Sequence, residues 1–293
     1  MNNIRTVEAI IPPPPTHMVG DGFKVHNFFP SSSLIGDSGM SPFFLMDYNS
    51  KWVLAPSEKP RGVGVHPHRG IETITIAYHG RIAHHDSAGN SGVIGEGDVQ
   101  WMTAGGGVLH KEYHEKEFSR KGGLFQMVQL WINLPKRFKM TPPKYQAIEN
   151  KDMARVMLED GKSYVDLIAG SHRGKTGPAF AFTPTNLFSA HLKKGVEADF
   201  SFNREYNTGL LVIEGELKIN GTQNAPADNF VYFSHDGEKF EIEALADSIA
   251  LILSGEPVNE TIFPYGPFVM NTRDEIKQAY EDYYNGKFGH LED

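Results

Sequence analysis

The sequence predicts an all-β protein made of two β-barrels, with a single helix close to the C-terminus. Short segments rich in β-branched and aromatic residues recur between Gly- and Pro-rich turns, which is typical of sandwiches and barrels. Strand-and-turn patterns of the first half reappear in the second, and clear helical periodicity occurs near the end. With 293 residues, 40% of them apolar, the chain can bury a sizeable core.

The first half of the chain carries the stronger strand patterns. Residues 31–41, with their serines and glycines, and residues 58–64 are expected to be loops. The nearly continuous apolar run of residues 124–133 predicts a central strand buried on both faces. The predicted strands of this half are residues 3–11, 23–29, 42–48, 71–78, 82–85, 99–102 and 124–133.

A proline-rich, basic stretch follows at residues 134–143 and predicts a linker between domains. The boundary is placed within it, which gives an N-terminal barrel of residues 1–140 and a C-terminal barrel of residues 141–293 that includes the helix. The strand pattern then returns in weaker form. The predicted strands are residues 154–158, 164–169, 187–192, 198–202, 209–213, 217–219, 229–233, 240–244 and 249–253.

The two halves share a weak internal repeat. Residues 74–80 and 210–215 are both apolar strands that end in a turn glycine. Residues 97–101 have a similar counterpart in residues 227–231. Two copies of one barrel explain both similarities economically.

The C-terminal helix is predicted from a capping signature followed by a periodic apolar face. Thr272 lies three residues before Glu275, as in a capping box. Apolar and aromatic residues then recur at helical spacing, and Asn285-Gly286 ends the pattern. We expect an amphipathic helix of about three turns that packs on a sheet.

Composition excludes several classes of protein. The net charge of −8 argues against direct binding to nucleic acid or to acidic membranes. The absence of cysteine excludes disulfides, thiolate metal sites and cysteine nucleophiles. The first residues lack the apolar core of a signal peptide, and the longest aliphatic run, residues 249–253, is too short to cross a bilayer. We expect a cytoplasmic protein without a membrane segment.

Two pairs of candidate metal ligands stand out. His66 and His68 are two residues apart, and so are His110 and Glu112. Residues at this spacing in a strand point to the same face, so two neighbouring strands would bring three imidazoles and one carboxylate to one point. Such ligands suit Fe(II), Mn(II), Ni(II), Cu(II) or Zn(II) rather than Ca(II) or Mg(II).

Other polar residues near these pairs are weaker candidates. Glu72 lies an even number of residues after His66 and His68, so in a continuous strand it would point to the same face and could face the metal. The preferred interpretation is that Glu72 accepts a hydrogen bond from a ligand histidine and orients it. Of the cluster His79, His84 and His85, we expect one to be a packing residue or a partner of the ligands and the others to be solvated.

Several further motifs have a structural interpretation. Trp101, Met102 and Phe125 are expected in the core rather than against a substrate. The three glycines at residues 105–107 predict a tight turn, because no Lys-Ser/Thr follows them as in a phosphate-binding loop. The acidic residues of the tail, Glu281-Asp282 and Glu292-Asp293, are expected on a solvated face.

Taken together, these motifs resemble the pirin family of the cupin superfamily. The matching segments are His66-Pro67-His68-Arg69-Gly70, Glu72-Thr73, His84, Asp86-Ser87, Gly89-Asn90, residues 97–105, 129–131, 133–135 and 140–143, Tyr145-Gln146, and residues 265–272. The resemblance is weak between residues 154 and 253. It implies a bicupin, two barrels packed face to face, with Fe(II) in the N-terminal barrel bound by His66, His68, His110 and Glu112.

The sequence departs from the family pattern near the fourth ligand and in one strand beside the expected pocket. The differing positions are Gly106, Leu109, Lys111, Tyr113-His114, Ser41 and residues 46–48. These differences bear on the substrate rather than on the metal.

The resemblance implies three classes of function. The first is a dioxygenase that opens a flavonol such as quercetin, with dioxygen as co-substrate and Glu112 as a catalytic residue that accepts a substrate proton. The second is an iron-dependent regulator that binds a partner protein, such as a transcription factor or a metabolic enzyme. The third is a metal-stabilised structural module. We favour the dioxygenase.

The second barrel is expected to lack a metal. The internal repeat aligns the ligands His110 and Glu112 with Phe240 and Ile242, and places no histidine near residues 200–203, the counterpart of His66 and His68. Strand alternation would point Phe240 and Ile242 into the core and their acidic neighbours to water.

Overall fold

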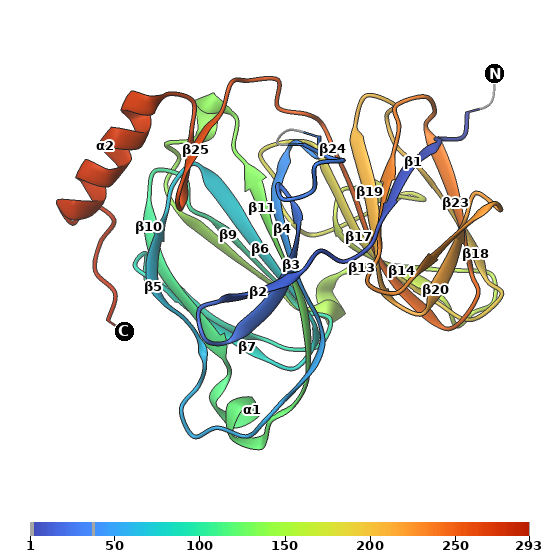
Figure 1. Cartoon of the computed structure of the whole chain (residues 1–293), viewed down its shortest axis with the longest axis horizontal. Coiled ribbons are helices and arrows are strands. Elements are labelled where there is room, and N and C mark those ends of the chain that lie inside the picture. The colour runs from blue at the N-terminus through green and yellow to red at the C-terminus, as the bar shows by residue number, and fades with distance from the viewer. Residues whose placement is uncertain (1–2, 37–38, 293) are drawn as a thin grey trace. The chain divides into compact units, whose positions relative to one another are not determined.

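The computed structural model describes residues 3–36 and 39–292, and it confirms the all-β fold class. The chain forms two compact units that interleave along the sequence (Figure 1). Unit A comprises Pro15–Asn27, Phe43–Asn150 and Val258–Asp293. Unit B comprises Met1–Pro14, Phe28–Pro42 and Lys151–Pro257. The α-helices of the described residues are α1 (Lys116–Lys121) and α2 (Arg273–Tyr284).

Unit A is a cupin-type barrel built from two antiparallel sheets. The larger sheet has the order β12 (Lys144–Ile148), β9 (Val99–Thr103), β6 (Ile71–His79), β11 (Gly123–Asn133), β4 (Phe43–Leu54), β3 (Phe23–Phe29) and β2 (Thr16–Val19). The smaller sheet has the order β5 (Gly62–His68), β10 (Val108–His114), β7 (Ile82–Asp86) and β8 (Ser91–Ile94). A hairpin of β25 (Phe263–Tyr265) and β26 (Phe268–Met270) joins this unit.

Unit B repeats this plan of one seven-stranded and one four-stranded sheet. The larger sheet has the order β1 (Val7–Ile11), β22 (Phe230–Phe233), β19 (Asn207–Glu214), β24 (Ser248–Gly255), β17 (Thr185–Leu192), β14 (Tyr164–Ala169) and β13 (Ala154–Met157). The smaller sheet has the order β18 (Glu197–Ser201), β23 (Lys239–Ala244), β20 (Glu216–Ile219) and β21 (Gln223–Pro226). The short pair β15 (Ser171–His172) and β16 (Lys175–Thr176) completes it.

The sequence-based division at residue 140 does not match these units. The predicted linker lies inside unit A, whose break falls after Asn150. Within the linker, buried Lys139 donates hydrogen bonds from Nζ to Gly70 O, Asn133 Oδ1 and Val269 O at 2.6–3.0 Å. At the N-terminus, β1 pairs with β22 and so belongs to unit B.

The C-terminal helix forms as predicted but packs in the other unit. Thr272 is its N-cap, with both hydrogen bonds of the capping box to Glu275. The buried face of α2 contacts β26 and Phe288. Asp282 was expected on a solvated face, but it is buried and pairs with Arg69 at 2.9 Å. The helix is therefore part of unit A, whereas the sequence had assigned it to the C-terminal barrel.

Most predicted strands are present, and the omissions are short or polar. All nine strands predicted between residues 154 and 253 have a counterpart. In unit A, β4 is longer than predicted, and β5 begins in the segment expected to be a loop. The elements α1, β2, β8, β12, β15, β16, β21, β25 and β26 were not predicted, because segments this short lack a clear period.

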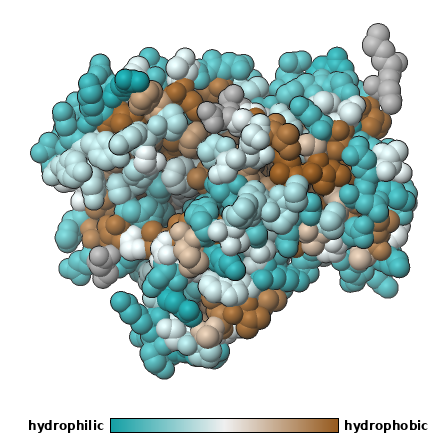
Figure 2. Space-filling model, in the orientation of Figure 1, coloured by the Kyte–Doolittle hydropathy of each residue, from teal (hydrophilic) through white to brown (hydrophobic). Residues whose placement is uncertain are grey.

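The face shown in Figure 2 is largely hydrophilic, and its apolar side chains form separate patches between polar ones. Among the described residues, no helix is both long and apolar enough to span a bilayer.

Candidate metal centre

The two ligand pairs predicted from the sequence lie on adjacent strands of unit A. Strands β5 and β10 are antiparallel neighbours, and His66 lies directly opposite His110. Alternation along β10 buries Val108, His110, Glu112 and His114 on one face. The pairing shifts register between His110 and Glu112, so Glu112 lies opposite Val63.

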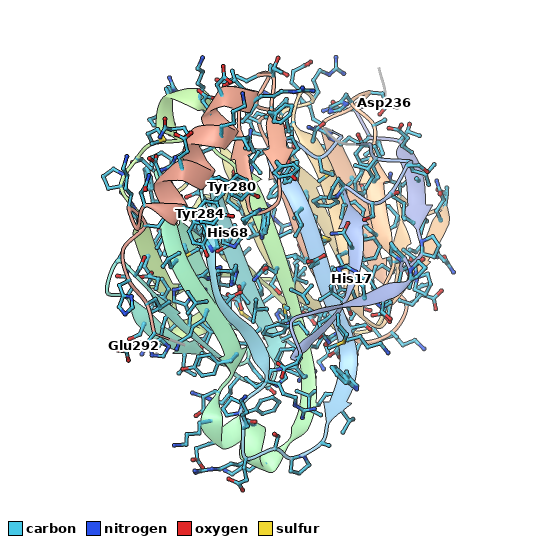
Figure 3. All side chains as sticks on the ribbon, turned by 60° about the vertical axis from the view of Figure 1, so that its left-hand side comes forward. His17, His68, Asp236, Tyr280, Tyr284 and Glu292 are labelled. Atoms are coloured by element: carbon cyan, nitrogen blue, oxygen red, sulfur yellow. The ribbon has the colours of Figure 1, made fainter. Side chains whose placement is uncertain are left out.

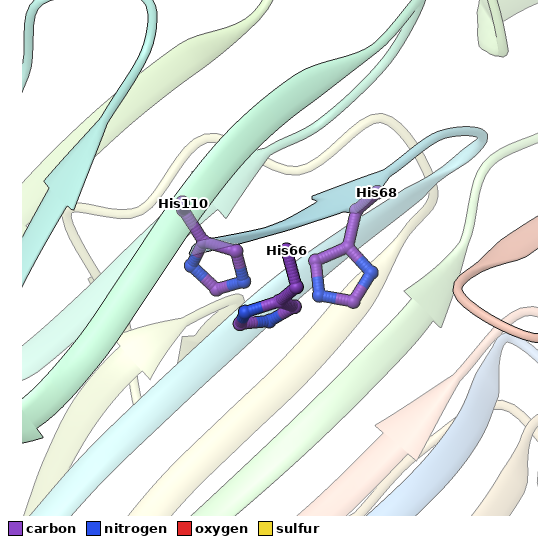
Figure 4. A group of neighbouring side chains, drawn as sticks. All are labelled: His66, His68 and His110. Carbon is purple, nitrogen blue, oxygen red and sulfur yellow. The ribbon is translucent and has the colours of Figure 1, made fainter. Parts of the chain in front are cut away.

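Three imidazoles converge at this point of the sheet (Figure 4). The ring centroids of His66 and His110 are 4.2 Å apart, those of His68 and His110 are 4.8 Å apart, and those of His66 and His68 are 4.9 Å apart. One ring nitrogen from each of the three lies within 4.8 Å of the others. A first-row transition metal takes imidazole nitrogens at about 2 Å, so small side-chain adjustments would complete such a site.

Hydrogen bonds leave the Nε2 atoms of two histidines available. His66 Nδ1 is 2.8 Å from Gly64 O, and His68 Nδ1 is 3.1 Å from Pro267 O. A carbonyl only accepts, so each Nδ1 must carry the proton and donate it. The lone pair of each neutral imidazole then lies on Nε2, as in histidines that bind metals.

Both ring nitrogens of His110 are buried, and neither has a hydrogen-bond partner among the described residues. A buried polar atom without a partner is destabilising, and a metal ion would provide that partner. Burial also holds the pKa of His110 well below its ordinary value and lowers the pKa of His68 to about 3, with the neighbouring His66 adding to both shifts. These imidazoles are therefore neutral at physiological pH and able to bind a cation.

Glu112 is buried and held by three donors. Its Oε1 accepts hydrogen bonds from Thr75 Oγ1 and Gln100 Nε2, both at 3.0 Å, and its Oε2 accepts one from Gln129 Nε2 at 2.6 Å. A carboxylate oxygen of Glu112 and one ring nitrogen each of His110 and His84 lie within 4.8 Å of one another. His66 and His68 are not part of this group. The structure thus brings the three predicted histidines together and places Glu112 beside His110.

His84 is the member of its cluster that lies next to the site. Its ring is buried, 5.4 Å from that of His110. Asp86 Oδ2 is 3.3 Å from its Nε2, and Gln100 donates to its Nδ1 at 3.0 Å. Both nitrogens of His84 are therefore engaged, unlike those of His110. His79 and His85, which were expected to be solvated, are partly buried. The Nδ1 of His79 is 3.2 Å from Glu96 Oε1, and that of His85 is 3.1 Å from Tyr113 Oη.

Glu72 does not face the site. The chain turns at Gly70, which has a φ of 80°, so the alternation of side chains along β5 does not continue into β6. The even spacing of His68 and Glu72 therefore does not put them on one face. Thr75 on β6 reaches Glu112, whereas Glu72, three residues earlier, points to the other face and accepts a hydrogen bond from Thr103 Oγ1 at 2.7 Å. Burial raises the pKa of Glu72 to about 7.

A cavity of about 210 Å³ opens beside His66, His68 and Glu112. Figure 3 shows His68 among the strands of this barrel. The walls include Phe23, Met127 and Trp131, whose ring centroid is 4.8 Å from that of His68. Trp101, Met102 and Phe125 are fully buried, as expected of core residues.

Strand β11 contributes a polar and an aromatic residue to this cavity, which was not predicted. Residues 124–133 were expected to be core on both faces, whereas Gln129 and Trp131 line the cavity. The polar Gln129 inside an apolar run was the one sign of this role.

In unit B, the positions that align with the ligands belong to the core. Phe240 and Ile242 are buried, whereas Glu241 is exposed. The ring of Phe240 lies 4.4 Å from that of Phe233 and 5.3 Å from that of Phe200. The predicted inward orientation of Phe240 and Ile242 is confirmed. The absence of a metal from this barrel stays a prediction.

Two barrels of this plan, one with a cluster of histidines at its mouth, define the class of double-barrelled cupin proteins. The pirin family profile matches residues 22–132, and the profile of the pirin C-terminal cupin domain matches residues 187–289. The chain belongs to the pirin family.

Several relatives resemble the chain over almost its whole length. A crystal structure of quercetin 2,3-dioxygenase from Acinetobacter baumannii is 44% identical, with a TM-score of 0.92, and the match covers 99% of this chain and 100% of that one. A Pseudomonas aeruginosa protein named "Putative quercetin 2,3-dioxygenase" is 43% identical over 93% of this chain and 94% of its own. A pirin-like protein of Solanum lycopersicum is 36% identical over 92% and 88%.

Proposed function

We propose that the protein is a metal-dependent dioxygenase that opens flavonols such as quercetin, with Fe(II) held by His66, His68, His110 and Glu112. The observation that carries the proposal is the convergence of three neutral imidazoles beside a buried carboxylate and an aromatic-walled cavity. The names of the relatives from Acinetobacter and Pseudomonas support the same activity.

The donor set decides which ions fit. Nitrogen and carboxylate ligands without sulfur suit Fe(II), Mn(II), Ni(II), Cu(II) and Zn(II). Among these ions, membership of the pirin family favours Fe(II). A bound iron ion would supply Lewis acidity and redox chemistry toward dioxygen. His110, with both nitrogens buried and unpaired, gains the most from a bound ion.

Proton transfer and the positioning of the substrate depend on side chains of the protein. Glu112 accepts the hydroxyl proton of the substrate at one carboxylate oxygen, a role that requires position first and a suitable pKa second. Gln129, Gln100 and Thr75 fix the orientation of that carboxylate. Trp131 and Phe23 contact the aromatic rings and keep water from the reacting face.

Oxygen uptake tests the proposal. The protein is loaded with Fe(II), supplied with quercetin, and followed with an oxygen electrode and by carbon monoxide release. Uptake should depend on both metal and flavonol, and Glu112→Gln should slow it about 100-fold or more, whereas Glu58→Gln, on the surface, should not. Absence of uptake with every first-row metal in a fully loaded protein would contradict the proposal.

A further inference from the structure

A second carboxylate lines the cavity at a distance from the candidate ligands. Asp47 lies on β4, in the strand segment whose sequence departs from the family pattern. It is only 8% exposed, which is unusual for a charged side chain. Neither the metal centre nor the role proposed for Glu112 uses it.

The surroundings of Asp47 leave one oxygen unpaired. Asn27 Nδ2 donates to Asp47 Oδ1 at 2.7 Å, and no other hydrogen bond reaches this carboxylate among the described residues. The other oxygen, Oδ2, is therefore an acceptor without a donor in a wall of the cavity. An acceptor that lines a cavity and receives no donor from the described residues can accept a hydrogen bond from a ligand.

The sheet fixes the position of Asp47 relative to the metal centre. Asp47 lies directly opposite Gln129 in the β4–β11 pair, and Gln129 donates to Glu112 at 2.6 Å. Directly opposed side chains have Cβ atoms about 5 Å apart. Glu112, Gln129 and Asp47 thus form a row that leads from the candidate ligands along the cavity wall.

The other walls limit what the ligand can be. Val25, Val63, Met127 and Trp131 make them apolar, and the volume of about 210 Å³ is little larger than the 150 Å³ cavity known to bind benzene. The enclosed part therefore fits one aromatic ring. A ring hydroxyl satisfies Asp47 without adding a second desolvated charge.

We propose that Asp47 is a specificity residue that accepts a hydrogen bond from a ring hydroxyl that is not bound to the metal. The preferred ligands are thus aromatic rings with an adjacent pair of hydroxyls for the metal centre and one further hydroxyl for Asp47. The inference rests on the proposed function, because it takes the metal centre as the other anchor of the ring.

Matched ligand pairs test the role of Asp47 by binding alone. Zinc-loaded protein is titrated without oxygen with pyrogallol against 3-methylcatechol, and with hydroxyquinol against 4-methylcatechol, by calorimetry and by tryptophan fluorescence. Each pair places a hydroxyl or a methyl at the same ring position. Wild-type protein should prefer the hydroxyl about tenfold in at least one pair, because a hydrogen bond to a buried charge is a strong one.

Two variants and one control complete the test. Asp47→Asn should reduce this preference to within about threefold, and Asp47→Leu should reverse it in favour of the methyl group. Asp274→Asn, on the surface of α2, should leave it unchanged. Zinc content and melting temperature show that each variant is folded.

Turnover and binding separate the two proposals. A hydroxyl preference that depends on Asp47 in a protein without oxygen uptake supports the role of Asp47 and contradicts the dioxygenase. Oxygen uptake together with an equal preference in wild type and both Asp47 variants overturns the role of Asp47 alone. No hydroxyl preference in the wild type, or no binding of any catechol, also overturns it.

Discussion

His66 and His110 face each other across the β5–β10 pair, with their ring centroids 4.2 Å apart. Side chains directly opposite in an antiparallel pair share a face, so this one register brings both ligand pairs to the same side of the sheet. The position of each candidate ligand therefore depends on the pairing of two strands that are distant in the sequence.

Gln129 should control metal affinity without being a ligand. Gln129→Leu removes the 2.6 Å hydrogen bond to Glu112 Oε2 and lets the carboxylate rotate. We expect metal affinity to fall about 10–100-fold, as is usual when a partner of a ligand is lost. Competition with a chromogenic chelator measures it. Gln223→Leu, at an exposed position of β21, is the control, and equal affinities for both variants would contradict the prediction.

Glu72→Gln should change the pH dependence of stability and leave the metal centre intact. Because burial raises the pKa of Glu72 from 4.5 to about 7, the folded chain binds this proton more tightly than the unfolded chain does. The wild type therefore loses stability as the pH rises from 4.5 to about 7. The variant does not, because glutamine has no carboxyl group to ionise.

Urea unfolding below and above this window, with metal analysis of the same samples, measures both effects. The stability of Glu72→Gln relative to the wild type should rise with pH, at unchanged metal content. The surface variant Glu58→Gln should show no such trend. Loss of metal from Glu72→Gln would restore the interpretation of Glu72 as a partner of the ligands.

Lys139→Met should destabilise the protein strongly. The ammonium group of Lys139 donates to three oxygens in the interior of unit A, and its loss leaves Asn133 Oδ1 and two carbonyls without this donor. We expect the free energy of unfolding to fall by about 2–4 kcal/mol. Lys136→Met, three residues earlier and exposed, should lie within about 0.5 kcal/mol of the wild type. Similar melting temperatures for the two variants would refute this role of Lys139.

The same lysine shows where sequence-based prediction reached its limit. The three prolines and three basic residues of the segment 134–143, Lys139 among them, indicate an exposed linker by composition alone. Burial of a lysine depends on acceptors that tertiary structure supplies. Those acceptors come from residues as distant as Val269. The assignment of β1 to unit B and of α2 to unit A was not predicted for the same reason. Both depend on contacts with residues that are distant in the sequence.

Local periodicity, in contrast, was sufficient for the candidate ligands and for most strands. The i, i+2 spacing of His66 and His68 survives because both lie within β5, whereas Glu72 lies beyond the turn at Gly70. The roles of Gln129 and Asp47 were not predicted, because neither a polar residue in an apolar run nor a departure from the family pattern shows which side chains of β11 or β4 line a cavity. Their role follows from the β4–β11 register.

Unit B should be stabilised by packing where unit A has ligands. Phe240→Ala removes an aromatic ring that contacts Phe233 and Phe200, and we expect a loss of about 3–5 kcal/mol in the stability of this unit. Metal content per folded chain should not change. Glu241→Ala, the exposed neighbour, is the control. A drop in metal content that accompanies Phe240→Ala in folded protein would show a second site in this barrel.

Metal analysis of purified protein tests the central claim most directly, that His66, His68, His110 and Glu112 hold one transition-metal ion. Elemental analysis after reconstitution should give one ion per chain in the wild type and in His290→Ala, an exposed histidine of unit A. The double variant His66→Ala, His110→Ala should remain folded and bind almost none. One tightly bound ion per chain in the double variant, or two in the wild type, would contradict the account.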